Sequence, residues 1–142
     1  AIVIECLKLK KQICDKGSTC YEEVTALFLR WNASVTDEDG EINYLTLAGL
    51  IAQDPELRKA YDNIMRPHVR NCVAAHIREL DKECQVGIYY TEDPWMCRRV
   101  VIVDSADIVD TGLHLLCEEV WLVESDFETR VERMMSMQGL FN

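Results

Sequence analysis

Short runs of β-branched and other apolar residues restrict most strongly how this chain can fold. They occupy residues 2–4, 100–103 and 120–123, and each is three or four residues long. Runs this short, without polar alternation, suit parallel strands that are covered on both faces better than they suit helices. We therefore predict parallel strands at these positions, with the strand at 100–103 in the centre of the sheet.

Helical patterns lie between these runs, which predicts an α/β domain with a parallel sheet. Ser18 can cap a helix whose apolar side chains recur at helical spacing from Val24 to Trp31. A short helix is predicted at 45–53, and a last helix should begin after Ser125 or Asp126 and run to about Met137.

The region from Pro55 to Cys84 is rich in good helix formers. Pro67 lies inside it, and proline removes a backbone donor and clashes with the preceding turn. We therefore predict two helices that meet near Arg66, followed by a short strand at 86–90.

Composition limits the size of the fold and the classes of partner. With 142 residues, 49% of them hydrophobic, the chain can close one core, so we predict a single domain over residues 1–142. A net charge of -10 argues against direct nucleic-acid binding, even though residues 8–11 are basic, and we interpret that run as a solvated face. No apolar run approaches the roughly 18 to 20 residues that span a membrane.

The seven cysteines do not indicate a metal site or a disulfide scaffold. They form no Cys-x-x-Cys pair and no tight cluster with a histidine, which zinc sites usually require. We expect reduced, mostly buried thiols and an intracellular protein. The cysteines stand at positions 6, 14, 20, 72, 84, 97 and 117.

Two stretches together carry a family resemblance. The first contains DEDGEIN at 37–43, DPE at 54–56 and PHVR at 67–70. The second contains VIVDSADIVDTGL at 101–113, EVWLV at 119–123 and ERMM at 132–135. In order and spacing this series resembles the dephospho-coenzyme A kinases, which are phosphate-loop kinases. The resemblance implies an acceptor-side helical region at 35–85 and a lid-side helix at 125–142.

The departures from the family pattern concern its charged groups. The sequence contains no Gly-x-x-x-x-Gly-Lys-Ser/Thr, so we expect a fold that lacks the family's first strand and phosphate loop. Glu5-Cys6-Leu7 stands where the family has Asp-Ala-Asp, Arg66 replaces a histidine, ADIVD at 106–110 replaces Pro-Leu-Leu-Phe-Glu, and Met137 replaces the lid arginine. Phosphoryl transfer depends mainly on positioning and charge, so these losses predict a catalytically degenerate protein.

The resemblance also suggests site residues. Glu5 is the one catalytic candidate, and only if the protein is active. Arg70 and Asp110 match positions near the acceptor pocket and could hold a residual coenzyme A-like ligand, although an ion pair or a helix cap is the alternative for both. Arg133 could touch a nucleotide cofactor or could lie on a solvated face. We predict no metal ligands.

The leading hypothesis is a non-catalytic, kinase-like subunit of a larger assembly, with protein partners, no cofactor and a mitochondrial rather than cytoplasmic location. The alternative is an active dephospho-coenzyme A kinase whose phosphate loop lies outside these residues and which uses ATP and magnesium. A third hypothesis is a regulatory module that binds coenzyme A without converting it.

Overall fold

The computed structural model describes residues 1–88 and 100–138, and side chains at 1–83 and 100–136. Two strands and five α-helices follow one another with one short 3₁₀ helix before the last α-helix. In chain order they are β1 (Ile2–Glu5), α1 (Cys6–Ile13), α2 (Thr19–Arg30), α3 (Tyr44–Gln53), α4 (Pro55–Ile88), β2 (Val101–Asp104), η1 (Leu113–Leu116) and α5 (Phe127–Gln138).

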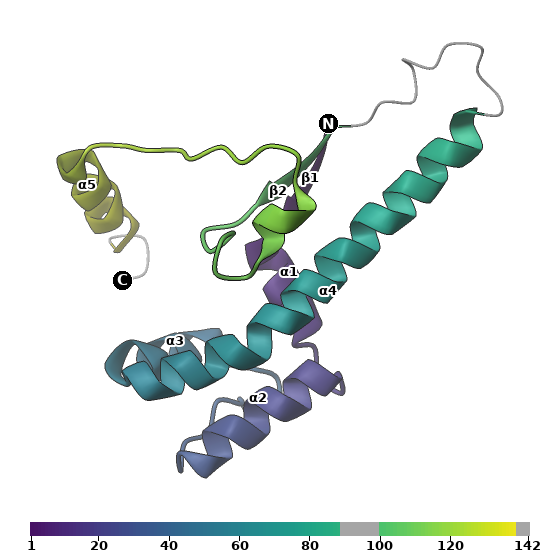
Figure 1. Cartoon of the computed structure of the whole chain (residues 1–142). Coiled ribbons are helices and arrows are strands. Elements are labelled where there is room, and N and C mark those ends of the chain that lie inside the picture. The colour runs from purple at the N-terminus through teal and green to yellow at the C-terminus, as the bar shows by residue number, and fades with distance from the viewer. Residues whose placement is uncertain (89–99, 139–142) are drawn as a thin grey trace.

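The two strands form a parallel pair, as the sequence predicts (Figure 1). Their register places Ile2 opposite Val101 and Glu5 opposite Asp104. A small parallel sheet flanked by helices makes this an α/β fold, consistent with a phosphate-loop kinase-like architecture. In the described residues, however, the sheet has only two strands. Ile102 is consequently 46% exposed, so the prediction that 100–103 is covered on both faces is wrong there.

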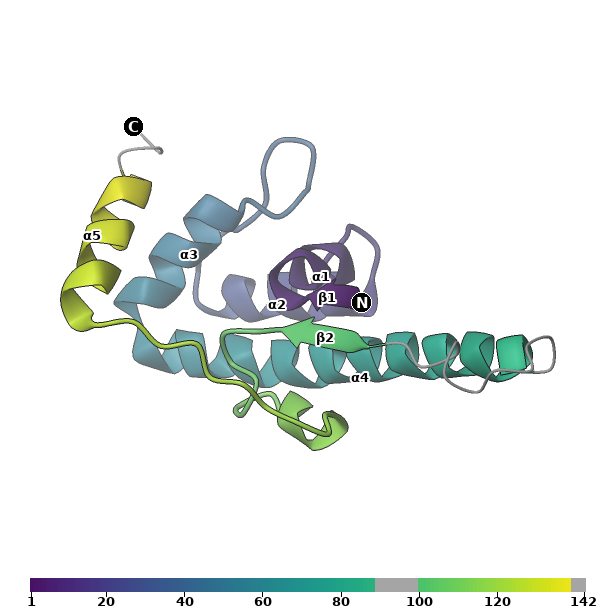
Figure 2. The same cartoon turned by 90° about the horizontal axis from the view of Figure 1, so that it is seen from above.

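Helix α4 is the element around which the core assembles. It packs against α1, α2, α3 and η1, and Figure 2 shows the first three helices on one side of it and η1 on the other. Val69 and Val73 of α4 have no exposed surface, and neither has Phe28 of α2. The remaining buried apolar side chains are Ile4, Cys6, Leu9, Cys14, Cys20, Val24, Leu27, Val35, Ile42, Leu47, Leu57, Met65 and Leu113.

Four helix starts have side-chain caps within the described residues, and at the start of α4 the Asp54 carboxylate accepts from the Leu57 amide at 3.1 Å. The Ser18 hydroxyl accepts a hydrogen bond from the Tyr21 amide, and the Asn43 side chain does the same for Thr46. Asp126 accepts from the Thr129 amide at 2.8 Å. The predicted start of α2 at Ser18 and one of the two predicted starts of α5, at Asp126, are therefore confirmed, because the free amides of a first turn favour such partners.

The prediction of two helices that meet near Arg66 is wrong, because α4 continues through Pro67. Met65 and Val69 are both buried on either side of the proline, and this packing outweighs the lost backbone hydrogen bond. Figure 1 shows α4 changing direction partway along, as helices containing proline commonly do. The helix also occupies 86–88, so the strand predicted at 86–90 is wrong over those residues, and the rest of it lies outside the described residues.

Residues 120–123 do not form the predicted strand. They run as an extended, exposed segment between η1 and α5, with Trp121 84% and Val123 94% exposed. A strand requires a hydrogen-bonded neighbour, and none pairs with this segment within the described residues. The β-branched composition favours a strand, but composition does not supply a pairing partner.

Helix α5 lies at the end of that segment, apart from the sheet in Figure 1. Its described side chains are exposed apart from a half-buried Thr129. In the described parts of the chain, no helix is both long enough and apolar enough to cross a membrane.

Candidate functional site

A cavity of about 290 Å³ opens at the carboxyl ends of β1 and β2. In open parallel sheets, ligands bind at this edge because the chain leaves each strand there and presents side chains and helix starts. Here the residues come from the end of β1, the first turns of α1 and the segment after β2. The cavity is lined by Glu5, Cys6, Leu7, Lys10, Asp104, Ser105, Ala106 and Asp107.

In this cavity the Asp107 carboxylate accepts hydrogen bonds from two side chains. Lys10 Nζ lies 2.8 Å from its Oδ2, and the Ser105 hydroxyl donates to its Oδ1, also at 2.8 Å. Burial by itself would raise the pKa of Asp107, but the hydrogen bonds from Lys10 and Ser105 and the charge of Lys10 outweigh it and hold the pKa below its usual value. Asp107 is therefore charged at neutral pH, and it engages the cavity's lysine.

Two further carboxylates end the two strands. Glu5 and Asp104 are register partners, so their backbones lie side by side at the edge of the sheet. The Glu5 side chain is half-exposed and is paired with Lys8 at 2.8 Å. Leu7, two residues on, is 74% exposed at the cavity and provides no charge.

Cys6 also lines the cavity but is unsuited to nucleophilic chemistry. Its side chain is almost fully buried, and burial raises the pKa of its thiol. A protonated thiol is a poor nucleophile. We interpret Cys6 as part of the packing beneath the site.

Arg70 and Asp110, the predicted acceptor-side residues, come to the same loop after β2. Gly112 has φ of 71°, and a side chain built on it would come within 3.2 Å of Arg70 Nη1, so the glycine leaves room for that guanidinium. Asp110 lies 3.8 Å from Arg66 Nη2, which also lies 3.8 Å from Asp62. The alternative of an ion pair thus has geometric support for Asp110.

Arg133, the predicted cofactor-side residue, is exposed on α5. Because α5 stands apart from β1 and β2, the structure does not bring Arg133 to the cavity (Figure 1). The side chain of Met137 lies outside the described residues. In the described part of the chain, no group of three or more His, Cys, Asp and Glu side chains is arranged to hold a metal ion.

The sequence interpretation missed Lys10 and Asp107. Residues 8–11 were interpreted as a solvated face, whereas Lys10 is half-buried in an ion pair with a residue 97 positions away. Their proximity to strand ends was the available signal, because both follow β1 or β2 within five residues.

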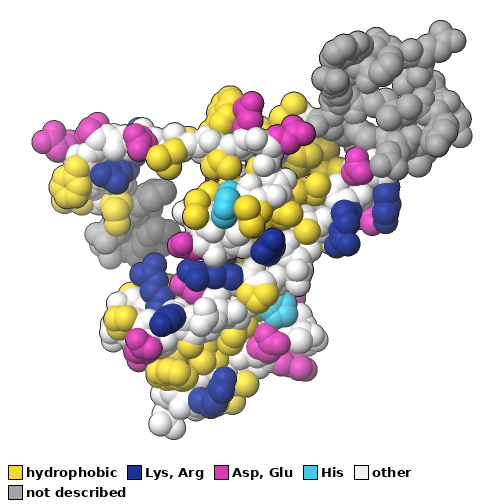
Figure 3. All heavy atoms as spheres, viewed as in Figure 1, with side chains coloured by type: hydrophobic (Ala, Val, Ile, Leu, Met, Phe, Trp, Pro, Cys, Tyr) yellow, Lys and Arg dark blue, Asp and Glu magenta, His cyan; other side chains and the backbone are white. Residues whose placement is uncertain are grey.

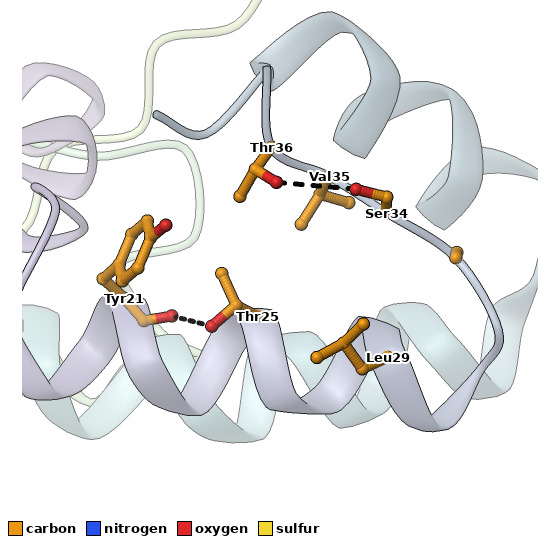
Figure 4. Close-up of a pocket in the computed structure, with 7 residues that line it drawn as sticks. Tyr21, Thr25, Leu29, Ser34, Val35 and Thr36 are labelled. Atoms are coloured by element: carbon orange, nitrogen blue, oxygen red, sulfur yellow. Dashed lines mark hydrogen bonds between the residues drawn. The ribbon is translucent and has the colours of Figure 1, made fainter. Parts of the chain in front are cut away.

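A second cavity, of about 180 Å³, lies between α2 and the segment that follows it (Figure 4). The Thr25 hydroxyl donates to the Tyr21 carbonyl at 2.8 Å, and the Ser34 and Thr36 hydroxyls are 3.5 Å apart. No charged side chain lines it, so it is a weaker candidate for a phosphate-bearing ligand. It is lined by Tyr21, Thr25, Leu29, Ala33, Ser34, Val35 and Thr36.

The Lys10–Asp107 pair predicts an acid-sensitive contribution to stability. Because the pKa of Asp107 is lower in the folded than in the unfolded chain, the pair's stabilisation is present above the unfolded pKa and is lost as the pH falls through the folded pKa. Lys10→Met should lower the unfolding free energy at neutral pH by about 1 kcal/mol and reduce its decline as the pH falls below the unfolded pKa value of 3.8 for Asp107. Urea unfolding at neutral pH and below that pKa measures both effects. Lys8→Met, which removes only the exposed pair with Glu5, is the control and should change neither; equal effects of both variants would contradict the prediction.

The sequence was compared with models of protein families and with curated proteins. The model of the dephospho-CoA kinase family matches residues 1–142. A dephospho-CoA kinase of Geobacter sulfurreducens is 26% identical over 140 residues, which is 99% of this chain and 63% of the relative. Those of Shouchella clausii and Moorella thermoacetica are 26% and 22% identical, covering 97% and 99% of this chain and 62% and 59% of their own lengths. The chain thus spans about three fifths of the length of these curated relatives.

Proposed function

The chain belongs to the dephospho-CoA kinase family, and from that premise we propose that it is a catalytically degenerate, kinase-like subunit of a larger protein assembly. The observation that carries the proposal is the chemistry of the cavity at the strand ends. Where the family pattern has a second carboxylate, the exposed Leu7 lines the cavity. The cavity's lysine, Lys10, is already engaged by Asp107.

This chemistry is poorly suited to phosphoryl transfer. That reaction needs charged groups that position the transferred phosphoryl group and stabilise its transition state. A leucine can neither accept a proton nor orient a metal ion, and a lysine paired at 2.8 Å must first be released before it can attract a phosphate. Met137, in place of the lid arginine, removes a further cation.

An exposed apolar surface supports the assembly part of the proposal. We call Trp121, Leu122, Val123, Phe127, Met134 and Met135 the apolar arm; all six are more than 60% exposed. Figure 3 shows hydrophobic side chains over α5, where part of this arm lies. Monomeric proteins rarely expose large apolar patches, and tryptophan is enriched at the centres of protein interfaces. We place the assembly in mitochondria, by analogy with metabolic enzymes retained in organellar complexes.

Native purification of the tagged gene product tests this proposal. We expect it to elute with other subunits, and Trp121→Ala should weaken their retention by about 30-fold, the loss of a typical tryptophan anchor. The stability of the chain should not change, because the described hydrogen bond of the Trp121 ring goes only to the exposed Glu119. Leu45→Ala is the control, since Leu45 is equally exposed on α3, outside the arm. Recovery only as a free monomer would contradict the proposal.

The second candidate is an active dephospho-coenzyme A kinase, and the pair Glu5 and Asp104 favours it. Two carboxylates at adjacent strand ends provide hard oxygen ligands of the kind that magnesium prefers. In this candidate the enzyme transfers the γ-phosphoryl group of ATP to the ribose 3'-hydroxyl of dephospho-coenzyme A, with Glu5 as the surviving acid. The full gene sequence should then contain Gly-x-x-x-x-Gly-Lys-Ser/Thr, and the protein that it encodes should convert dephospho-coenzyme A to coenzyme A.

A further inference from the structure

Three sulfur atoms, two from neighbouring cysteines and one from a distant methionine, meet in the core. Cys14 Sγ and Cys20 Sγ are 3.1 Å apart, and each lies 3.5 Å from Met65 Sδ. Cys14 follows the end of α1, Cys20 lies in the first turn of α2, and Met65 lies within α4. At most 3% of each side chain is exposed. This cluster is separate from the cavity at the strand ends, and no role proposed above uses it.

We propose that Cys14 and Cys20 form an oxidant-responsive thiol pair that closes to an intramolecular disulfide. A disulfide requires the sulfurs to approach to about 2.05 Å, so the observed separation leaves roughly 1 Å to travel. Only residues 15–19 separate the two cysteines, and Gly17 in this turn has φ of 87° with open space around it. The turn can therefore absorb a small shift without moving the helices far.

The environment assigns different roles to the two thiols. The hydrogen bond between the thiols lowers the pKa of Cys20, which outweighs the effect of burial, and the neighbouring charges of His68 and Glu23 act in opposite directions. The same hydrogen bond and burial raise the pKa of Cys14. Cys20 also lies in the first turn of α2, where the positive end of the helix dipole favours a thiolate, whereas Cys14 follows the C-terminal end of α1. Since the thiolate is the nucleophile, Cys20 attacks first and Cys14 resolves.

Hydrogen peroxide is the oxidant class that this arrangement fits, because it is small enough to reach the cluster when the exposed turn at 15–17 opens locally. The Cys20 thiolate attacks one peroxide oxygen, the O–O bond breaks, and the departing hydroxide takes a proton to become water. Cys14 then loses its proton and attacks the sulfenic sulfur of Cys20, and the S–O bond breaks to release a second water. In total, two thiols and one peroxide give one disulfide and two waters.

Peptide mapping of the peroxide-treated, otherwise unmodified protein tests the proposal. Trypsin cuts after Lys11, Lys16 and Arg30, so Cys14 falls in peptide 12–16 and Cys20 in peptide 17–30. We expect these two peptides to be joined under non-reducing conditions and separated by a reductant. The closed loop should also raise the Tm by about 5 °C, reversibly. A mixed pair with another cysteine, or oxygen gained by Met65 while both thiols stay free, would overturn the proposal.

Single variants test the order of attack. In Cys14→Ser, the Cys20 sulfenic acid has no resolving thiol and should be trapped by dimedone, whereas Cys20→Ser should leave Cys14 unmodified. Cys72→Ser is the control, because Cys72 is a half-buried free thiol outside the cluster, and it should form the disulfide normally. Equal dimedone labelling of Cys14 and Cys20 in the two variants would refute the assigned roles. The mapping of the unmodified protein still decides the pairing if a serine variant fails to fold.

Discussion

Coenzyme A formation by the intact gene product is expected to be at least about 100-fold slower than by an active relative assayed beside it, because a positioned acid–base group alone typically contributes 10² to 10⁴. Leu7 supplies no such group at the strand ends, and Met137 stands where the family pattern has a positively charged arginine. The assay supplies ATP, magnesium and dephospho-coenzyme A, and coenzyme A is measured by mass spectrometry.

The matched experiment restores the two charges. Leu7→Asp combined with Met137→Arg should raise the rate above that of the parent if these positions account for the loss. Leu7 is 74% exposed, so the exchange costs little stability. Leu45→Asp, at an exposed leucine on α3 that lines neither cavity, introduces the same charge elsewhere and should leave the rate unchanged. A parent rate equal to that of the active relative would instead establish the second candidate function.

The parts of the fold that local chemistry determines were predictable from the sequence. Ser18 and Asp126 cap helices because their side chains reach amides three residues away, and such contacts are fixed by the sequence itself. The β-branched runs at β1 and β2 likewise predicted parallel strands, and the two strands do pair in parallel.

Tertiary contacts decided the elements that were predicted wrongly. Pro67 breaks an isolated helix, but the buried neighbours Met65 and Val69 hold α4 together through it. Residues 120–123 have the composition of a strand, yet composition does not provide the neighbouring strand that pairing needs. At Pro67 the packing of its buried neighbours preserves the helix. At 120–123 no strand within the described residues pairs with the segment.

The candidate site was predictable in its location more than in its contacts. Glu5 was correctly placed at a strand end, whereas the ligand-binding roles of Arg70 and Asp110 stay predictions. The Lys10–Asp107 pair joins residues 97 positions apart, and the contacts of Met65 with Cys14 and Cys20 span 51 and 45. Because only the folded chain brings such partners together, neither cluster has a spacing pattern that sequence rules detect.

The second large effect is expected from Phe28→Ala, which should lower the unfolding free energy by about 3 to 5 kcal/mol. Phe28 has no exposed surface, and its ring packs edge-on against Tyr61, with centroids 6.3 Å apart and planes at 67°. Truncation therefore loses the burial of a large side chain, leaves a cavity between α2 and α4, and removes an aromatic pair.

Leu29→Ala is the control for this prediction, since Leu29 is the next residue of the same helix and is 68% exposed. It makes the same kind of truncation without opening the core, so its cost should stay within about 0.5 kcal/mol. Urea unfolding, followed by circular dichroism, measures the unfolding free energy of both variants. Both introduce alanine, so the helix propensity of the new residue is the same in each. Similar losses would mean that α2 does not pack on α4 as described. Because α4 also carries Arg66 and Arg70, a loose α2–α4 contact would leave the loop after β2, which contains Asp110 and Gly112, without a fixed support.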